Sequence, residues 1–559
     1  MNFCLGIYAG IVMVEKKISE VMAQQRISPR KLTDQQWQAL VALHRTYIQE
    51  HHDYFLASQY YSAPPSLKEE ASKQAMPARL WRHGIQNFLE LLRRELPASL
   101  EHMLSFIALA YANMTLLRES VPRFEDTWVE YLGDLARHRM AISERPDGWK
   151  AWNAVATMWY QKAADISPGG GRIQRHLGVV ARPNIIQQLF YHSKALVSAQ
   201  PSPEARDSIL HVVDLLPLPG EKCQHEKDLL DKDLYPTVET LCLPGETGCQ
   251  HYPAAESALV KAAGLLASRG SITACDKLTD HFLSTLDEYI GRTKFRFRVQ
   301  GVAIASTLCA CLLDFGHTDS FLWKLLVHGQ RQFDAVLEKL RRDSKRPIIE
   351  PQEISHLKGQ QRRAYLDTTL SSTGHHKVRH PDPGRSIKNG QFSSSEDAVV
   401  RACHLFQLAV GLVLTRVSDK NILPFAHVIL AFLVSLTYVP WALFYIEEHV
   451  PWASLVHFLN NVARSGVSDT RFEKPTFPQN HGGTGRQLPE DFMMRGLAWA
   501  SNYHPDRFFE GDVVDEDERT LELPSHAGPR TERCLWLGVQ LSLVSAWVVI
   551  LFSYRKSTE

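Results

Sequence analysis

Apolar residues recur at intervals of three and four along most of the chain. Clear examples are two sets, namely Leu80, Ile85, Phe88, Leu89, Leu91 and Leu92, and Leu100, Met103, Phe106, Ile107 and Leu109. This spacing places apolar side chains on one face of an α-helix. Alternating runs typical of strands are scarce, and hairpin dipeptides do not separate any of them. The pattern therefore predicts an all-α fold.

A repeat signal lies inside this helical pattern. A Leu-Gly pair is followed by small residues, a tyrosine and a proline, in the order Leu132, Gly133, Ala156, Tyr160, Ala163 and Pro168. These steps match the second helix of a tetratricopeptide unit, in which small residues let two helices approach closely. Leu177-Gly178 opens a weaker second copy, echoed by Tyr191, Ala195 and Pro201. Such units stack around a shared core and leave a concave surface for partners.

Composition breaks divide the chain. Residues 216–252 are rich in Pro, Cys and acids and indicate an insertion, while residues 346–395 are rich in Ser, Gly and Pro and predict a disordered linker. Residues 467–487 form a polar loop. The predicted parts are an N-terminal helical segment (1–50), a tetratricopeptide domain (51–215), a second helical domain (253–345), a C-terminal helical domain (396–533) and a closing segment (534–554).

Two long apolar stretches raise the question of a membrane. Residues 422–446 contain no Asp, Glu, Lys or Arg, but Pro440 interrupts them, so we expect a buried helix there. Residues 534–554 also carry no charge and are flanked by Arg533 and Arg555. Their length fits either the closing helix of the fold or a single transmembrane tail anchor.

The charge balance limits nucleic-acid binding to local patches. The 559 residues carry 62 basic and 61 acidic side chains, which gives a net charge of +1. With 44% hydrophobic and 22% charged residues, the chain is neither wholly disordered nor collagen-like nor a polytopic membrane protein. Near-zero net charge also excludes a globally basic nucleic-acid binder.

One basic patch interleaves with aromatic residues, which suits stacking of bases. Its cations are Arg292, Lys294, Arg296 and Arg298, with Phe295 and Phe297 between them. On one continuous helix, Arg292 and Arg296 share a face, and Lys294 and Arg298 share another. The patch is either an RNA or DNA contact or an ordinary solvated face with core phenylalanines. A second basic run with the same two interpretations contains Lys339, Arg341, Arg342, Lys345 and Arg346.

Cysteine usage and missing motifs argue against catalysis. Nine cysteines, an odd number, are spread along the chain, which is typical of reduced thiols in an intracellular protein. One cluster could ligate zinc, but without a CxxC pair a solvated insertion is the preferred interpretation; it contains Cys223, His225, Cys242, Cys249 and His251. Phosphate-loop, HExxH and GxSxG motifs are absent. We expect no enzyme activity, no cofactor and no metal.

A family resemblance goes further than these patterns. The segment Tyr131-Leu-Gly-Asp-Leu-Ala-Arg-His-Arg139, with Tyr160-Gln-Lys-Ala163, Pro168 and Gly171 after it, resembles the Est-type (ever shorter telomeres) DNA/RNA-binding family. That family includes telomerase accessory subunits and the SMG adaptors of nonsense-mediated mRNA decay. The match covers most of residues 50–545, with further similar segments on both sides of this one, at 53–59, 76–83, 191–195, 289–292, 451–460 and 488–496.

The resemblance implies a 14-3-3-like tetratricopeptide domain followed by a stack of helical hairpins. It further implies a non-catalytic adaptor of the nucleus and cytoplasm that binds a phosphorylated partner, either a Upf-like helicase or a telomerase complex. RNA or telomeric DNA would be a second partner. Some relatives carry a nuclease domain after the helical region, and we expect none here because the chain ends before one would fit.

The resemblance also assigns a phosphopeptide site. The family's key arginine falls on Arg137, and arginine is the side chain that best matches a phosphate group. A second basic position of the family falls on Gln86, a departure for which Arg82 or His83, one turn earlier, would have to substitute. The ordinary alternative for Arg137 is a solvated or ion-paired helix residue.

Two other functions remain open at this point. One is a tetratricopeptide scaffold unrelated to RNA and tethered to a membrane through residues 534–554. The other is an enzyme that uses the Cys/His cluster of residues 223–251 with zinc.

Overall fold

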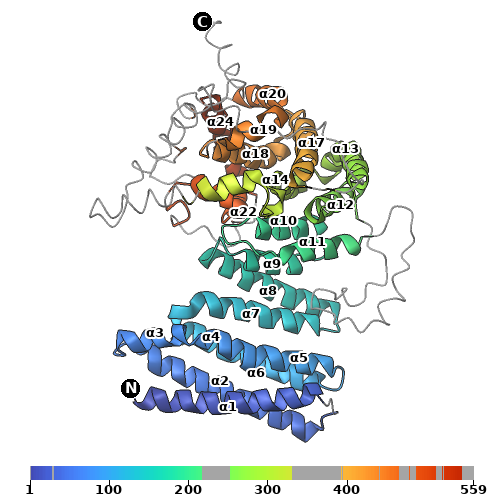
Figure 1. Cartoon of the computed structure of the whole chain (residues 1–559). Coiled ribbons are helices and arrows are strands. Elements are labelled where there is room, and N and C mark those ends of the chain that lie inside the picture. The colour runs from blue at the N-terminus through green and yellow to red at the C-terminus, as the bar shows by residue number, and fades with distance from the viewer. Residues whose placement is uncertain are drawn as a thin grey trace. The chain divides into compact units, whose positions relative to one another are not determined.

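The protein is seen in a computed structural model as a chain of packed helices (Figure 1). The structure describes residues 2–27, 31–216, 252–329, 331, 392, 394–439, 441–464, 472, 477–478, 486–505, 507–510, 519 and 522–543. Besides helices, this part contains two isolated β-bridges, Gly170 with Gln200 and Ser198 with Leu497. The prediction of an all-α fold is therefore confirmed.

The chain divides into two compact units between Ser167 and Pro168. The described helices of the first unit are α1 (Asn2–Ile27), α2 (Asp34–Gln59), α3 (Pro65–Lys73), α4 (Met76–Arg79), η1 (Leu80–Gln86), α5 (Asn87–Arg94), α6 (Leu100–Ser120), η2 (Pro122–Phe124), α7 (Glu125–Ala141) and α8 (Pro146–Ile166). Successive long helices pack side by side, α1 on α2, α6 on α7 and α7 on α8 (Figure 1). Large aromatic side chains fill the core between them, among them Tyr47, Phe55, Phe88, Phe106 and Trp128.

The second unit contains the remaining helices. Its described elements are α9 (Gly171–Val180), α10 (Ile185–Leu196), α11 (Ala205–Asp214), α12 (Ala254–Ser268), α13 (Ile272–Thr293), η4 (Lys294–Arg296), α14 (Phe297–Leu312), η5 (Asp314–Gly316), α17 (Ser395–Leu414), η6 (Lys420–Ile422), α18 (Leu423–Leu436), α19 (Ala442–Ile446), η7 (Glu447–His449), α20 (Trp452–Ala463), α22 (Pro489–Met494), η8 (Ala498–Asn502), η9 (Pro524–His526) and α24 (Ala527–Ser542). One continuous hydrophobic core runs from α10 to α24.

The glycines of both Leu-Gly pairs lie where two helices approach closely. A Cβ at Gly133 on α7 would lie 2.6 Å from the Tyr160 ring, so glycine is what allows α8 to approach. In the second unit, Gly178 on α9 makes the same kind of contact with the ring of His192 on α10. The sequence prediction had assigned that place to Tyr191, which is wrong by one residue.

The boundaries of the units differ from the predicted domains. Residues 1–50 were expected outside the first repeat domain, yet α1 and α2 belong to the first unit, where Tyr47 and Ile48 are buried. Residues 168–215, expected in the first domain, belong to the second unit. The reason is that α10 and α11 share apolar side chains with α12 and α14. The predicted 253–345 and 396–533 domains share that same core.

Helix α18 confirms the expectation of a buried helix within residues 422–446. Every residue from Leu423 to Leu436 is buried, and the helix ends before Thr437. The insertion predicted at 216–252 and the linker predicted at 346–395 lie almost wholly outside the described residues, as does most of the 467–487 loop.

The closing segment begins as a helix of the core. Cys534, Leu535, Leu537 and Leu541 on α24 are buried, and Gly538 packs against Leu459 of α20. A transmembrane span starting at residue 534 would have to remove these side chains from the second unit. Residues 544–554 lie outside the described part. The described half of the segment thus packs as the closing helix of the second unit.

Three other helical stretches in the described part are long and apolar enough to cross a membrane, by length and composition alone. They are Leu100–Ser120, Ile272–Leu312 and Ser395–Leu414. In the last two, 72% and 61% of the apolar window is buried inside the fold, whereas in the first only 33% is.

Candidate functional site

Arg137, the expected phosphate ligand, is held by neighbours on α7 and α8. Its Nε donates a hydrogen bond to Tyr160 Oη at 3.1 Å, and its Nη2 donates to Asp134 Oδ1 at 3.3 Å. Tyr160 Oη in turn donates to Asp134 Oδ1 at 2.7 Å. Burial by itself would lower the pKa of Arg137, but Tyr160 and Asp134 raise it well above its usual range. The guanidinium is therefore charged, and Asp134 balances that charge.

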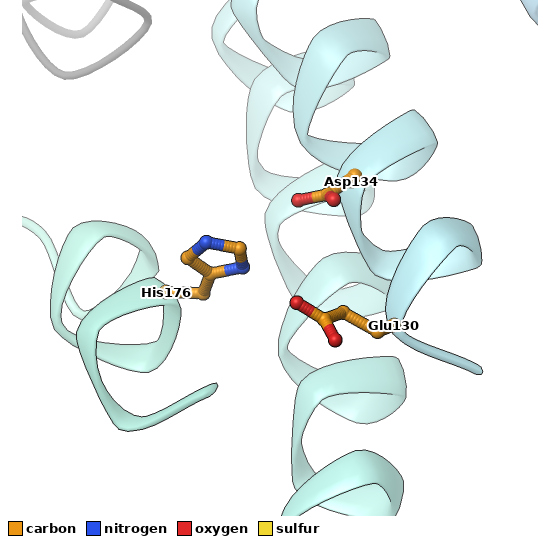
Figure 2. Close-up of side chains that lie close together, drawn as sticks. All are labelled: Glu130, Asp134 and His176. Atoms are coloured by element: carbon orange, nitrogen blue, oxygen red, sulfur yellow. The ribbon is translucent and has the colours of Figure 1, made fainter. Parts of the chain in front are cut away.

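A second buried acid lies close to Asp134 on the same helix. Figure 2 shows Glu130 and Asp134 one turn apart on α7, and both side chains are buried. Because Arg137 already faces a carboxylate one turn away, it is a poor site for a phosphate dianion on its own. This arrangement is the ion-paired alternative that the sequence left open.

Arg82 and His83, the expected helpers of Arg137, lie on η1. His83 Nε2 lies 3.9 Å from Glu15 Oε1 of α1, and Glu15 also binds Arg79 at 2.8 Å. Arg82 is exposed. Within the described residues neither side chain has a contact with Arg137, so the expected trio is not assembled.

Arg93 is a cation of the first unit that the sequence did not single out. Burial, together with the charges of Arg137 and Arg93 and against the opposing charge of Asp134, lowers the pKa of His138, the neighbour of Arg137, to about 3. Arg93 lies at the end of α5, two turns after Gln86 on the same helical face. Sequence reasoning missed Arg93 because it searched only within one turn of Gln86. A step of seven residues is two helical turns and returns to the same face, so the sequence did contain a signal for Arg93.

The basic patch at residues 292–298 is not one helix. Helix α13 ends at Thr293, a 3₁₀ turn covers Lys294–Arg296 with Lys294 at φ 49°, and α14 begins at Phe297. The shared faces predicted for Arg292 with Arg296 and for Lys294 with Arg298 are therefore wrong. Phe297 is fully buried, whereas Phe295 is 69% exposed.

The four cations of the patch have different surroundings. Arg292 pairs with Glu288 at 2.5 Å. Arg298 donates to Asn421 at 2.8 Å and lies 3.5 Å from Glu522. Lys294 and Arg296 are exposed and have no ion pair within the described ranges. The surface that remains is a corner formed by Lys294, Phe295 and Arg296, which we call the α13–α14 corner.

The other predicted basic and metal-ligating residues fall outside the described part. These are the second basic run, residues 339–346, and the Cys/His cluster of residues 223–251. The six described cysteines are buried free thiols, in agreement with the expectation of reduced cysteines.

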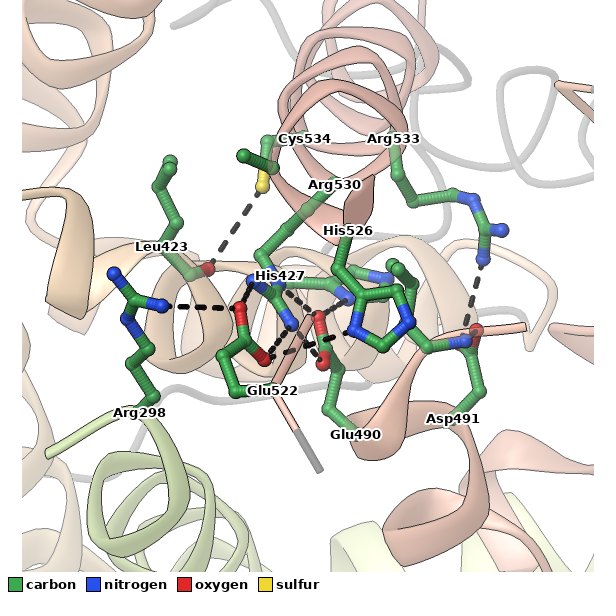
Figure 3. Close-up of polar contacts among 12 residues, drawn as sticks. Arg298, Leu423, His427, Glu490, Asp491, Glu522, His526, Arg530, Arg533 and Cys534 are labelled. Carbon is green, nitrogen blue, oxygen red and sulfur yellow. Dashed lines mark hydrogen bonds and ion pairs between the residues drawn. The ribbon is translucent and has the colours of Figure 1, made fainter. Parts of the chain in front are cut away.

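A buried charge network lies in the second unit (Figure 3). Arg530 of α24 makes two hydrogen bonds to Glu490 of α22, at 2.6 and 2.8 Å, and a further pair with Glu522 at 2.5 Å. His427 Nδ1 of α18 lies 2.9 Å from Glu490 Oε1. Burial would raise the pKa of Glu490, but Arg530 and His427 hold it well below its usual range.

The network explains the Leu-Pro-Glu-Asp motif at residues 488–491. Pro489 begins α22, and Asp491 Oδ2 accepts a hydrogen bond from the Leu488 amide at 2.9 Å. Arg533, one turn after Arg530, lies 3.4 Å from Asp491 and 4.1 Å from the Phe477 ring centre. Both acids of the motif, Glu490 and Asp491, thus form ion pairs that connect α22 to α24. We assign this cluster to folding of the second unit, because its charges satisfy one another.

Comparisons with known proteins give a limited result. No protein-family model matches the chain. Over 104 residues, the chain is 29% identical to EST/SMG-like protein 2 of Saccharomyces cerevisiae (strain ATCC 204508 / S288c). The match covers 18% of this chain and 8% of the yeast protein. Part of the chain is therefore similar to an EST/SMG-like protein.

Proposed function

We propose that this chain is a non-catalytic adaptor of the EST/SMG type, acting in mRNA decay or telomere maintenance. The observation that carries the proposal is the local similarity to EST/SMG-like protein 2, in a chain whose described part consists of packed helices. Helical stacks of this kind present surfaces to partners rather than reaction centres. The proposed partners are RNA or telomeric DNA and a phosphorylated protein, either a Upf-like helicase or a telomerase complex, met in the nucleus and cytoplasm.

The α13–α14 corner is the proposed contact for nucleic acid. Lys294 and Arg296 are exposed without an acidic partner in the described residues, so both charges are available to phosphates. Phe295 lies between them with 69% of its surface exposed, and a free phenyl ring is a platform for an unpaired base. Arg292 and Arg298 are not part of this contact because Glu288, Asn421 and Glu522 already engage them.

Reversing the two free charges of the corner should weaken binding of single strands. We expect Lys294→Glu/Arg296→Glu to make the dependence of log affinity on log salt shallower by about 1.4, since each lost phosphate contact accounts for about 0.7. Phe295→Ala should cost about fivefold or more through lost stacking. Fluorescence anisotropy with labelled single-stranded RNA and telomeric-repeat DNA measures both effects.

The matched control is Lys277→Glu/Lys324→Glu, which changes the net charge equally at two other exposed lysines. If both double variants lose the same affinity, binding is a general effect of net charge. The corner would then have no specific role.

The proposed phosphoprotein contact is centred on Arg93 together with Arg137. The charges of both guanidinium groups lower the pKa of His138, which supports the proposal of a joint contact on the first unit. Arg93 is partly exposed, and the structure shows no ion pair for it within the described ranges. A phosphate carries nearly two charges, so it benefits from a second arginine where Asp134 offsets the first.

Replacing Arg93 should therefore weaken phosphopeptide binding, although Arg93 lies outside the family motif. We expect Arg93→Glu to weaken binding of a phosphoserine peptide from a Upf helicase by about tenfold, because a charge-assisted contact is lost. The unphosphorylated peptide should bind equally to both proteins. Arg145→Glu, at an exposed arginine of the same unit, is the control. Equal binding of the phosphopeptide by all three proteins would remove this site.

A further inference from the structure

Helix α2 packs against an uncommon helical turn in the first unit. The turn is η1, Leu80–Gln86, a π-helix of a kind that is rare in proteins and is often found at functional sites. The approach is closest at Gly84, where an added Cβ would lie 2.8 Å from the Tyr47 ring of α2. His44, one turn before Tyr47, lies 2.7 Å from the Gly84 carbonyl oxygen through its Nδ1. A side chain of α2 therefore holds one carbonyl of the π-turn.

A second histidine, His51, lies two turns after His44 on the same face of α2, and both are fully buried. A carbonyl oxygen only accepts hydrogen bonds, so in each neutral ring the hydrogen is on Nδ1. His44 donates to the Gly84 carbonyl, and His51 donates to the Tyr47 carbonyl at 3.0 Å. We call these four residues the α2–η1 seam.

The other nitrogen of each ring has no room for a proton. Nε2 of His44 and Nε2 of His51 are buried without a hydrogen-bond partner among the described residues. A protonated ring would turn each Nε2 into a donor, and a buried donor without an acceptor is costly. The closed seam therefore fits two neutral imidazoles and excludes two imidazolium ions.

Apolar rings surround His44. It stacks on Phe88 of α5 with ring centres 4.2 Å apart, and it meets Phe106 of α6 edge to face at 6.0 Å. Burial lowers the pKa of His44 from 6.5 to about 4, although the hydrogen bond to Gly84 opposes this. Among the described residues no charged side chain contributes to this pKa.

Charged groups on three elements face His51. Burial, the charge of Arg79 on α4 and that of His83 on η1 lower its pKa to about 4, against the Tyr47 carbonyl and the charge of Glu15 on α1. Glu15 is the acid on this side, but it already pairs with Arg79 at 2.8 Å and accepts a hydrogen bond from Tyr47 Oη at 2.7 Å. Neither ring thus has an acid that is free to pair with it.

We propose that the α2–η1 seam is an acid-sensitive lock, which opens when His44 and His51 take up protons. Opening gives each Nε2 access to water, and histidine is the side chain whose charge changes most readily between pH 5 and 8. The proposed adaptor role is not needed for this lock, because every group in it belongs to the first unit's own core.

The direction of the pH effect follows from the two states. Solvated histidines have a pKa near 6.5, whereas in the closed seam both have a pKa of about 4. Below pH 6.5 the open state binds more protons, so stability of the closed seam is complete above that pH and is lost as pH falls toward 4. Against burial, hydrogen bonds from Tyr47 and Arg79 lower the pKa of Glu15, so Glu15 weakens the seam only at lower pH, below its usual pKa of 4.5.

The test measures amide hydrogen exchange of the full chain by mass spectrometry at pH 7 and pH 5, with the intrinsic pH dependence of exchange removed. Each imidazole that stays neutral down to about pH 4 should raise the opening constant about 20-fold between these conditions. We therefore expect protection of residues 34–59 and 80–86 to fall by about 400-fold at pH 5.

Two substitutions remove the titrating rings while keeping a donor near the position of Nδ1. His44→Asn and His51→Asn should each reduce the fall in protection to about 20-fold, and the double variant should abolish it. A general loss of stability lowers protection equally at both pH values, so it cannot imitate this change. His102→Asn on α6 is the control, because that ring is partly exposed and lies 2.8 Å from Asp34. It should leave the fall in place.

A second measurement needs no variant. Exchange of the imidazole carbon-bound hydrogen reports the titration of each ring in the parent chain, and we expect His44 and His51 to titrate at least one pH unit below a free histidine. Titration of either ring near pH 6.5 would overturn the proposal. Equal protection of the parent at the two pH values, or an undiminished fall in the double variant, would do so as well.

Discussion

Replacing Arg530 by methionine should destabilise the second unit by about 3–5 kcal/mol, because it leaves a buried acid without its cation. Arg530 is 2% exposed and Glu490 is 1% exposed, so water cannot solvate the carboxylate that remains. Glu522 loses the same partner; hydrogen bonds from His526 and Arg530, acting against burial, hold its pKa at about 2. Urea unfolding of the full chain measures the loss in the transition assigned to the second unit.

The control for this prediction is Arg292→Met. Arg292 also forms an ion pair, with Glu288, but its side chain is 79% exposed. Such pairs contribute about 0–1 kcal/mol, so this variant should unfold nearly as the parent does. Replacing both members of the buried pair, Arg530→Met with Glu490→Leu, should recover part of the loss, because the more deeply buried of the two acids is no longer left without its cation. Equal stability of the two single variants would contradict the role assigned to the network.

Replacing Gly496 by alanine should cost about 3 kcal/mol or more, through backbone strain and a steric clash together. Gly496 has φ +87°, a conformation that side chains disfavour, and an added Cβ would overlap the carbonyl group of Pro168. The Gly496 carbonyl also accepts a hydrogen bond from the Ala199 amide at 3.0 Å, so the backbone cannot move away freely. Thermal unfolding should show a clearly lower midpoint.

Gly528→Ala is the matched control in the same unit. Gly528 lies in α24, and nothing lies within 4 Å of an added Cβ. Alanine there should be neutral or stabilising by up to about 1 kcal/mol, since it favours the helix. If Gly496→Ala behaves like Gly528→Ala, the close approach to Pro168 is not a constraint on the fold.

Local periodicity was enough to predict the helices but not the division into units. The pattern at residues 100–109 predicted a helix that became α6, and residues 422–446 predicted the buried α18. The boundary between Ser167 and Pro168 was missed, because it depends on which core receives α10 and α11. That choice is made by contacts between distant segments.

The candidate sites show the same division. The sequence identified Arg137 but did not show that Asp134 and Tyr160 bind its side chain. Asp134 is three residues before Arg137 on the helix, and this spacing allows an ion pair without requiring one. The sequence also identified the patch around Lys294 but assumed a continuous helix. The break at Lys294 leaves Lys294, Phe295 and Arg296 exposed and turns Phe297 into the core.

The sequence by itself determined that this protein is all-α, that α18 is buried and that glycines lie where two helices approach closely. These properties follow from the spacing of side chains along one helix, which neighbouring residues set. Only the tertiary structure decided which charges are free. Arg298, Arg530 and Arg533 look alike in the sequence to Lys294 and Arg296, but the first three face acids or an amide brought from far along the chain. Whether a cation can meet a partner depends on such long-range contacts, and no local pattern encodes them.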